Sequence, residues 1–321
     1  MQTHNFTVAP PSSGKRLDVY LVEAGLGLSR RRIRQIIDVG GVYVNKRRIR
    51  IASRQVQTGD KVRVEYSEAG LKQLRTQKVT LKQEDLILER PGLFVINKPP
   101  GLPSQATLDQ TIMHVVPALA AVLTERGDAA GRKLILVHRL DKETSGVMLV
   151  ADGAKAATWL TEQFRERKIK KTYLAICYGI PKQTSFTESA HLSEIDKRTG
   201  DVRPVHAGGR TAVTHFRLLA KNPELGLSLL QCNPETGRSH QIRVHLQMNG
   251  LPLVGDKRYR VPGTKELAPA LADLTAVHHF LHAFALDVVP GPGEEHLVVT
   301  GQPPERFARF LELAGFKLPM P

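Results

Sequence analysis

The residue types best suited to chemistry gather in the stretch "VHRLDKETSGVMLVA", residues 137–151, where one carboxylate stands among cations. Arg139 and Lys142 flank Asp141, and nearby cations favour the ionised form of a carboxyl group and lower its pKa. The Gly-, Ser- and Thr-containing bend leads into an apolar run typical of a strand. An ionised carboxylate held on a loop by a rigid strand is a usable nucleophile or base. The same residues also fit a structural role, in which Asp141 caps the turn by binding backbone amides.

Two other segments carry side chains that could meet this carboxylate. In "GRSHQIRVHLQ", a helix would place His240, Arg243 and Gln247 on one polar side, at i, i+3 and i+7. An arginine in that position can form a bidentate contact with a carboxylate. In "KKTYLAI", strand alternation puts Tyr173 on the same face as Cys177, with a lysine two residues before the tyrosine. Taken separately, each segment is more often a packing or surface-pair feature than a site. No second carboxylate has an obvious pairing with the first, which argues against a two-carboxylate glycosidase.

The elements that would hold these side chains mix strands and helices from residue 84 to residue 321. The segments "LFVINKPPG", "KTYLAICYGI" and "LSLLQCN" predict strands, and "GAKAATWLTEQFRERK" and "GRSHQIRVHLQMNG" predict helices. They do not follow the regular βαβ rhythm of a parallel sheet. The expected fold class is therefore α+β, with a mixed, largely antiparallel sheet and flanking helices.

A separate small unit is predicted at residues 14–66, followed by a polar linker at 67–83. "RLDVYLVEAG" has apolar residues at helical spacing and stops at Gly25. "LSRRRIRQIIDVGG" predicts a second helix, with Ser29 as its N-cap and two glycines as its stop. "GVYVN" and "DKVRVEY" alternate like half-buried strands.

The charge of the chain predicts a polyanionic partner. The formal net charge is +15 with a pI of about 10.0, and residues 1–78 hold 16 Lys/Arg against 6 Asp/Glu. Nucleic acid and a membrane surface both fit such a charge. Two basic clusters close in sequence favour RNA, although a solvated helix face is the bland alternative. With 5% aromatic residues, recognition through backbone charge and shape is expected rather than general base stacking. The residues expected to bind RNA are Arg30, Arg31, Arg34, Lys46, Arg47 and Arg48.

Other features predict a cytoplasmic protein. No apolar run is long enough to span a membrane, and the first residues are polar and lack the apolar core of a secretory signal. Cys177 and Cys232 lack metal-ligand spacing, so we expect two reduced thiols and no metal site. No exposed apolar stripe suggests self-association, so a monomer without membrane contact is expected.

The order of the motifs resembles known families over nearly the whole chain. "RLDVYL", "SRRRIRQIIDVGGVYVN" and "VQTGDKVRV" resemble the RNA-binding domain of small-subunit ribosomal protein S4. "INKPPGL", "HRLDKETSG", "KTYLAI", "GRSHQIRVHL", "GDKRY" and "LHA" follow in an order that resembles the RluA-type RNA pseudouridine synthases, over about residues 88–300. The nine-residue match "HRLDKETSG" is the most specific of these.

The resemblance implies a role for several residues. Such enzymes isomerise uridine to pseudouridine with one aspartate, here Asp141, and with no metal or nucleotide cofactor. Arg243 matches the arginine that pairs with the aspartate, and Tyr173 matches a tyrosine that stacks on the base and is a candidate for removing the carbon 5 proton. Arg139 matches a residue proposed to fill the gap left by the flipped base, and Lys171 is expected to contact RNA. Base flipping is required because the sugar–base bond is unreachable inside a stack.

Several alternatives remain open at this point. Large-subunit ribosomal RNA is the expected substrate, and transfer RNA is the alternative within the same family. A non-catalytic RNA-binding or ribosome-assembly factor is an alternative of another class, and it would predict damage at the aspartate, tyrosine or arginine. A DNA or nucleoside glycosidase would need a water-activating base, which is not evident. The sequence does not decide between a sugar adduct and a glycal intermediate.

Overall fold

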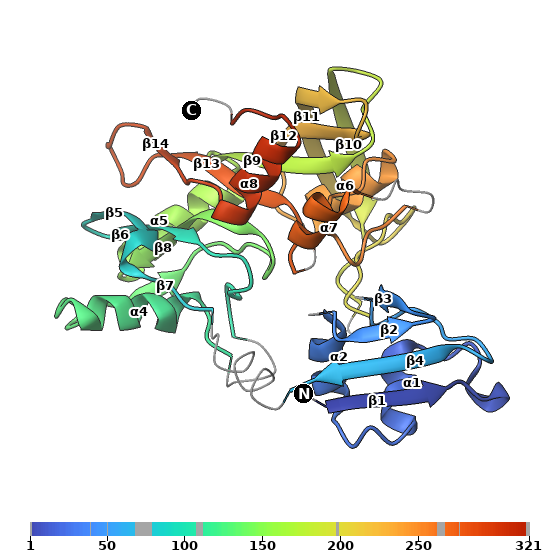
Figure 1. Cartoon of the computed structure of the whole chain (residues 1–321). Coiled ribbons are helices and arrows are strands. Elements are labelled where there is room, and N and C mark those ends of the chain that lie inside the picture. The colour runs from blue at the N-terminus through green and yellow to red at the C-terminus, as the bar shows by residue number, and fades with distance from the viewer. Residues whose placement is uncertain are drawn as a thin grey trace. The chain divides into compact units, whose positions relative to one another are not determined.

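The computed structural model separates into two compact units, residues 1–78 and 79–321 (Figure 1). The residues that the structure describes are 2–38, 40–49, 51–67, 79–106, 112–196, 199–261, 267–275 and 277–318. Of the predicted linker, residues 68–78 lie outside these ranges, and from residue 79 the chain belongs to the larger unit, where Leu81 is buried in the core. No helix in the described ranges is long and apolar enough to cross a membrane.

The smaller unit packs two helices on an antiparallel sheet. Its elements are β1 (Gln2–Thr7), η1 (Pro10–Ser12), α1 (Leu17–Glu23), α2 (Arg30–Asp38), β2 (Val42–Val44), β3 (Arg47–Ile49) and β4 (Lys61–Tyr66), with strand order β1-β4-β2-β3. Leu21, Ile33 and Ile37 face inward and are fully buried, as their helical spacing predicts. The Ser29 hydroxyl caps α2 by accepting from the Arg32 amide at 3.4 Å, which confirms the predicted start of this helix. Strand β1 lies outside the predicted bounds of the unit.

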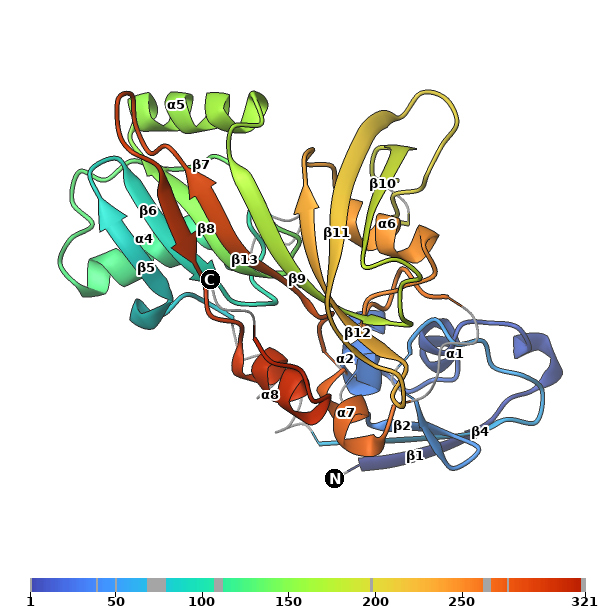
Figure 2. The ribbon, with the colours of Figure 1, turned by 90° about the horizontal axis from the view of Figure 1, so that it is seen from above.

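The larger unit is built on one ten-stranded sheet, which is mixed and mostly antiparallel. Its strands are β5 (Leu86–Arg90), β6 (Leu93–Lys98), β7 (Leu134–Leu136), β8 (Ser145–Asp152), β9 (Lys170–Tyr178), β10 (Ser185–Leu192), β11 (Arg210–Asn222), β12 (Leu227–Pro234), β13 (Leu281–Val288) and β14 (Leu297–Thr300). The order is β10-β11-β12-β9-β13-β8-β6-β5, with β14 on β13 and β7 on β8 (Figure 2). Among these described pairings, β13 and β8 run parallel and the others are antiparallel. The predicted fold class is confirmed.

Helices cover the sheet on both faces. They are η2 (Gln83–Asp85), α4 (Val115–Glu125), α5 (Ala154–Arg165), α6 (Gln241–Met248), α7 (Pro269–Leu274) and α8 (Glu305–Leu313). Strand β8 shows why both faces are covered, because its residues from Ser145 to Ala151 are all buried. Val147 and Leu149 face the core beneath α5, whereas Met148 and Val150 face the core beneath α4. A strand buried on two faces carries a continuous apolar run, and this one leads directly out of the "HRLDKETSG" motif.

Pairing between the central strands places residues that are distant in sequence side by side. Gly146 of β8 pairs with Ala283 of β13, Ala283 pairs with Tyr173 of β9, and Tyr173 pairs with Cys232 of β12. Tyr173 and Cys177 contact the same core cluster, as the predicted alternation requires, while Leu174 packs on the other face. One row of partners therefore crosses four strands and ends beside the motif that holds Asp141.

Candidate active site

The loop between β7 and β8 carries Asp141, and neighbouring segments hold the residues before it. His138 accepts a hydrogen bond from the Leu149 amide at 2.8 Å through Nε2 and stacks on Phe164 with ring centroids 4.5 Å apart. The buried Ser104 hydroxyl accepts from the Leu140 amide at 3.0 Å and donates to its carbonyl at 2.7 Å. The backbone just before the carboxylate is therefore held from two sides.

The residues after Asp141 are held by histidines from the segment that enters β13. Glu143 contacts His278, and the Thr144 hydroxyl lies 2.9 Å from His279 Nε2. Gly146 has φ +120°, and a Cβ there would lie 2.1 Å from the Ala283 carbonyl oxygen. A side chain cannot fit at that place, so the close approach of β8 and β13 requires glycine.

A buried lysine binds backbone carbonyls of the same loop and of the turn after β6. Lys98 is fully buried at the end of β6, and its ammonium donates to the carbonyls of Pro99 at 3.0 Å, Leu102 at 2.9 Å and Lys142 at 3.1 Å. Burial lowers the pKa of Lys98 to about 7, although the charges of Glu143 and Asp141 oppose that shift. Its three donors match three carbonyls, so one buried cation joins the "NKPPG" turn to the residue that follows Asp141.

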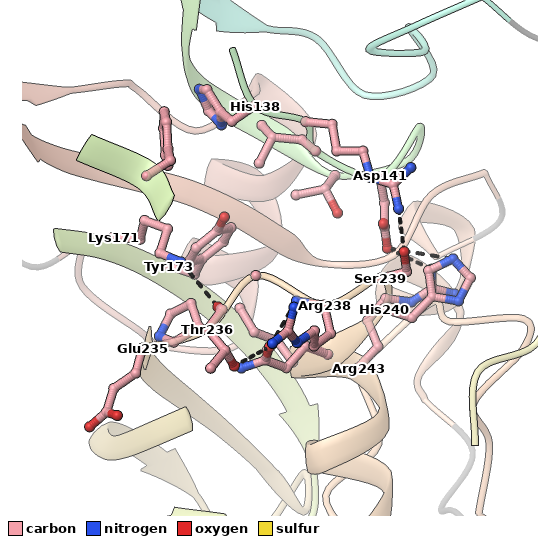
Figure 3. A pocket seen from close by; sticks show the side chains of 18 of the residues that line it. His138, Asp141, Lys171, Tyr173, Glu235, Thr236, Arg238, Ser239, His240 and Arg243 are labelled. Carbon is pink, nitrogen blue, oxygen red and sulfur yellow. Dashed lines mark hydrogen bonds and ion pairs between the residues drawn. The ribbon is translucent and has the colours of Figure 1, made fainter. Parts of the chain in front are cut away.

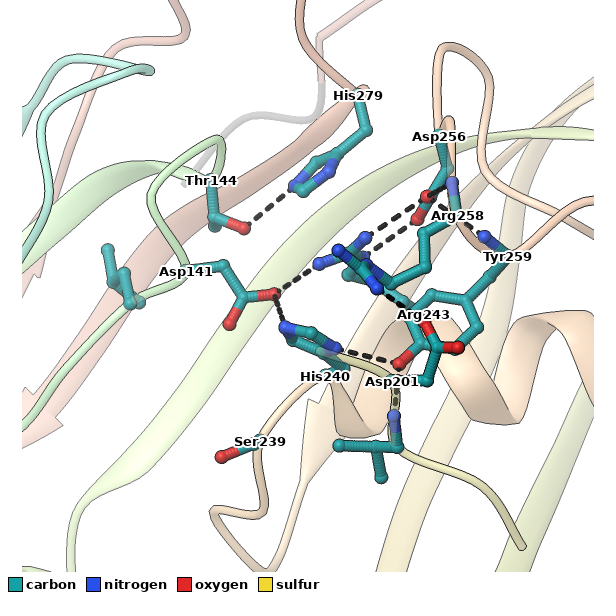
Figure 4. A network of polar contacts seen from close by, with 12 residues as sticks. Asp141, Thr144, Asp201, Ser239, His240, Arg243, Asp256, Arg258, Tyr259 and His279 are labelled. Atoms are coloured by element: carbon teal, nitrogen blue, oxygen red, sulfur yellow. Dashed lines mark hydrogen bonds and ion pairs between the residues drawn. The ribbon is translucent and has the colours of Figure 1, made fainter. Parts of the chain in front are cut away.

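The carboxylate of Asp141 faces an arginine instead of capping its own turn. The turn is closed by its backbone, because the Thr144 amide donates to the Asp141 carbonyl at 3.1 Å. Arg243 of α6 donates through Nη1 to Asp141 Oδ2 at 2.9 Å, and His240 Nε2 lies 4.0 Å from the same oxygen (Figure 4). The capping alternative is therefore not what the structure shows, and the predicted Asp141–Arg243 pair is present.

Arg243 is itself aimed by a second carboxylate. Its Nε and Nη2 donate to Asp256 Oδ2 at 2.7 Å and Oδ1 at 3.0 Å, and its guanidinium lies 4.9 Å from the centroid of the Tyr259 ring. Asp256 Oδ1 also accepts from the amides of Arg258 at 2.8 Å and Tyr259 at 3.1 Å. The side chain of Asp256 is 1% exposed, that of Arg243 9% and that of Asp141 25%. A bidentate pair fixes the guanidinium plane and leaves Nη1 for the more exposed carboxylate.

The charges of this group keep Asp141 ionised. Burial acts to raise the pKa of Asp141, but the charge and the hydrogen bond of Arg243, together with the charge of His240 at acidic pH where that ring is protonated, bring it below its ordinary value. Burial likewise acts to raise the pKa of Asp256, but Arg243 lowers it to about 2. Burial lowers the pKa of His240, against the opposing charge of Asp141. Near neutral pH the site therefore contains two carboxylates, one guanidinium and a neutral imidazole.

His240 and Gln247 depart from the predicted helix. The helix begins at Gln241, and His240 is its N-cap in the left-handed region, with φ 55°. Its Nδ1 lies 2.7 Å from the Tyr259 hydroxyl, which turns the ring toward Asp141. Gln247 instead donates to the Arg260 carbonyl at 3.0 Å. The expected common polar side is thus wrong for Gln247, and Arg243 lies in a buried setting because the "GDKRY" loop covers it.

A pocket of about 520 Å³ opens beside Asp141 (Figure 3). This volume lies within the range of small-ligand sites. Tyr173 lines it from β9, and the predicted residues Arg139 and Lys171 line it as well. Arg139 contacts the Ser239 hydroxyl, and Lys171 donates to the Thr236 carbonyl at 3.0 Å. Within the described ranges, no group of three or more His, Cys, Asp or Glu side chains could hold a metal ion.

The predicted RNA-binding residues of the smaller unit lie in two places. On the β2–β3 hairpin, Lys46, Arg47 and Arg48 are exposed. Arg48 contacts the Tyr43 ring, with its guanidinium 5.5 Å from the centroid. The side chain of Arg31 lies outside the described residues, and Arg30 and Arg34 belong to the cluster described next.

A buried carboxylate, Asp18 of α1, gathers three arginines. Asp18 has 0% side-chain exposure and accepts from Arg16 at 3.0 Å, Arg30 at 3.0 Å and Arg34 at 2.6 Å. The three arginine side chains remain close to half exposed. Burial acts to raise the pKa of Asp18, but the three arginines lower it to about 2. Asp18 therefore ties α1 to the basic start of α2.

Replacing Asp18 by Asn should loosen both helices. The pairing contributes about 1–2 kcal/mol above pH 4, a range discounted because the arginines are half exposed and screened by solvent. Hydrogen–deuterium exchange at pH 7 should therefore be roughly 5- to 30-fold faster in α1 and α2 than in the wild type. Because the pKa of Asp18 is lowered on folding, the difference should persist at pH 5 and disappear as pH falls through about 2. Glu23→Gln, which removes an exposed carboxylate from the same helix, should leave exchange nearly unchanged; equal effects of the two variants would contradict this account.

Several site residues were not predicted from the sequence. Asp256 lies in the quoted segment "GDKRY", but nothing in its spacing indicates that it meets Arg243. Lys98 lies in the quoted "INKPPGL" segment and Ser104 just after it, and their contacts to Lys142 and Leu140 span 44 and 36 residues. His240 was placed on the right helix end but without its contact to Tyr259.

The site thus combines one aimed carboxylate with an aromatic ring and a basic wall in a single pocket, as expected of an enzyme that acts on a base in a polyanion.

Comparison with known proteins agrees. The RNA pseudouridylate synthase model matches residues 92–248, and the S4 domain model matches residues 15–62. An uncharacterized RNA pseudouridine synthase of Synechocystis sp. is 33% identical over 97% of this chain and 93% of its own length.

Two further relatives point the same way. Ribosomal large subunit pseudouridine synthase C of Haemophilus influenzae is 32% identical over 87% of this chain and 85% of its own length. The solved structure of human RNA pseudouridylate synthase domain containing 4 matches with a TM-score of 0.61 at 26% identity, over 74% of this chain and 95% of that chain. The chain belongs to the RluA-type RNA pseudouridine synthases, which are isomerases, and carries an amino-terminal S4 domain that binds RNA.

Proposed function

We propose that this enzyme isomerises specific uridines of large-subunit ribosomal RNA, with Asp141 as its catalytic carboxylate. The observation that carries the proposal is the pocket that holds Asp141, aimed by Arg243, together with the ring of Tyr173. Several relatives that are about 32% identical are named ribosomal large subunit pseudouridine synthase C, which supports the ribosomal substrate. Such a substrate would place the enzyme in the cytoplasm, where we propose that it acts as a monomer.

The geometry suggests which oxygen of Asp141 meets the substrate. Arg243 and His240 both approach Oδ2, and no contact from the described residues reaches Oδ1 (Figure 4). In the proposed reaction the bond between uracil N1 and the sugar carbon C1′ breaks, the base rotates, C5 bonds to C1′ and loses its proton, and N1 gains a proton, so the product is an isomer of the substrate. Oδ1 would attack C1′ directly or assist formation of a glycal, and both routes use the same ionised carboxylate.

Tyr173 would stack on the target base and accept the C5 proton. Burial, and then the charge of Asp141, raise the pKa of Tyr173 far above its ordinary value, so the resting phenol is neutral. Stacking needs no ionisation, whereas accepting the C5 proton requires the neutral phenol to release its own proton, for which N1 of the detached base is a chemical acceptor. Arg139 would fill the gap left in the RNA by the flipped base.

Tyr173→Phe should separate these two roles. The ring area is kept, so RNA affinity should change by less than about threefold, while turnover should fall by roughly 10²- to 10⁴-fold because the acceptor oxygen is gone. Single-turnover release of tritium from RNA labelled at uridine C5, which is lost when pseudouridine forms, tests this. Tyr178→Phe, which removes a hydroxyl from the other end of β9, should keep full turnover. Unchanged turnover in Tyr173→Phe would remove the phenol as proton acceptor.

The substrate is tested by pseudouridine mapping across the transcriptome of cells that lack this gene, complemented by wild type or by Asp141→Ala. The proposal expects particular large-subunit ribosomal positions to disappear and only the wild type to restore them. Loss of transfer RNA positions instead would replace the ribosomal substrate with that alternative. If the modification pattern stayed the same, both substrates would be wrong and a role in assembly would be the better account.

A further inference from the structure

Three cations converge on the part of the pocket that lies beyond Tyr173. Lys171 projects from β9, Arg167 follows the end of α5, and Arg238 lies in the loop between β12 and α6; all three line the pocket. Figure 3 shows Lys171 and Arg238 on the side of the pocket where Thr236 lies. They come from three separate segments of the chain, so their meeting is a product of the fold and not of a local charge run.

The pocket supplies no carboxylate to offset these cations. Lys171 Nζ donates to the Thr236 carbonyl at 3.0 Å, and Arg238 Nε donates to the Thr211 carbonyl at 3.1 Å. The two carboxylates that line the pocket are engaged elsewhere, since Asp141 holds Arg243 and Glu235 Oε1 lies 2.6 Å from His215 Nε2. Burial, and then the charges of Arg167 and Arg238, lower the pKa of Lys171 to about 8. Like charges brought together without a counter-ion destabilise one another, which an arriving anion would relieve.

Arg167 is positioned by the turn that ends α5, where the Lys168 amide donates to the Gln163 carbonyl at 2.9 Å. Its φ of 59° lies in the left-handed region, at the position just after a helix where glycine is the common residue. A non-glycine residue in this conformation costs about 1 kcal/mol or more, and such strain concentrates at functional sites. The strained residue here is an arginine that lines the pocket.

The spacing along β9 relates this cluster to the base. Lys171 and Tyr173 are two residues apart on one strand, so they face the same side and lie roughly 6–7 Å apart along it. A nucleotide with its base on the Tyr173 ring would place its own backbone within reach of Lys171. We propose that Lys171, Arg167 and Arg238 form a binding site for a phosphate that flanks the target uridine. The proposal rests on the isomerase activity of the chain and is independent of whether the RNA is ribosomal.

The test asks whether removing one side chain and neutralising one phosphate affect KM together or independently. Oligonucleotides that wild type converts would carry a neutral methylphosphonate at one or the other of the two phosphates that flank the target uridine. For wild type, one of these positions should raise KM by about 10- to 100-fold, the range for a hydrogen bond to a charged group. Lys171→Met should raise KM on natural RNA by a similar factor with kcat changed less than about threefold, and the same methylphosphonate should then have no further effect.

Neighbouring residues supply the controls. Lys170→Met removes the adjacent lysine, whose side chain is 79% exposed and faces Asp287 at 3.8 Å, so it should behave as wild type does. In Arg238→Met, the methylphosphonate that has no further effect on the KM of Lys171→Met should likewise have none. Agreement between two different variants argues that neither result comes from misfolding. The slope of log affinity against log salt should fall by about 0.7 in each site variant.

The phosphate site would be overturned if each methylphosphonate raised KM by the same factor in wild type and in both site variants. Failure of the proposed function would look different, because wild type would then convert none of the RNAs. In that case the affinities of the same oligonucleotides, measured by fluorescence anisotropy, would still decide whether these side chains bind that phosphate.

Discussion

Replacing Asp141 by Asn should lower pseudouridine formation by about 10⁴-fold or more while RNA affinity stays within about threefold of wild type. The amide has the size of the carboxylate, and its oxygen can still accept from Arg243, so the geometry of the pocket should persist. What disappears is the negative charge that would attack or stabilise the sugar carbon. The S4 domain and the cations of the pocket should continue to hold the RNA, because none of them depends on this carboxylate.

The measurement is the yield of pseudouridine under single-turnover conditions, alongside binding by filter retention or anisotropy. Glu235→Gln is the matched control, since it removes a carboxylate from the rim of the same pocket that is held by His215. It should retain activity within about threefold. If Asp141→Asn kept more than about a hundredth of wild-type activity in a preparation free of host enzyme, the catalytic group would have to be sought elsewhere.

Arg243→Met should move the acidic limb of the pH–rate profile to higher pH. In the proposed mechanism the ionised form of Asp141 is the active one, so activity should be lost as pH falls through its pKa, which Arg243 holds below the ordinary value. Without the guanidinium, burial remains and acts in the opposite direction, so the pKa rises and the limb follows it. Turnover near pH 7 should also fall by about 10²-fold, because the carboxylate is no longer aimed.

The same replacement should destabilise the larger unit. Asp256 is 1% exposed and would lose its cation, and breaking a buried ion pair lowers the free energy of unfolding by about 3–5 kcal/mol. Arg243→Lys provides the comparison, because it keeps a cation but not the planar fork that holds both carboxylates. It should keep the acidic limb near its wild-type position while turnover falls. Identical pH profiles for wild type and Arg243→Met would show that Arg243 does not control Asp141.

The sequence predicts the residues proposed to carry out the chemistry better than it predicts the residues that hold them in place. Asp141 can be found because a nine-residue motif surrounds it, and the pair with Arg243 follows from a match in a second motif. Tyr173 is placed on the correct strand face because alternation is a local property of the chain. These three residues could therefore be named, and their meeting expected, before any coordinates were known.

The supporting residues could not be predicted for a physical reason. Asp256 meets Arg243 only because a loop without any periodicity folds back over α6. Lys98 reads as an ordinary polar residue at a strand end; the carbonyls of Pro99 and Leu102 that it binds are local, but that of Lys142 comes from 44 residues away. Strands β11 and β13 were likewise left unassigned, and β13 provides the parallel partner of β8. Such contacts arise from tertiary packing, which local patterns do not encode.

The row of strand partners from Gly146 through Ala283 to Tyr173 fixes the distance between the Asp141 loop and Tyr173. Adjacent strands lie about 4.8 Å apart whatever side chains they carry, so the separation between the end of the Asp141 loop and Tyr173 is set by backbone hydrogen bonds. Changes at the edge strands or in the smaller unit leave that length intact. Side chains on the edge strands can therefore differ without changing the distance between the Asp141 loop and Tyr173.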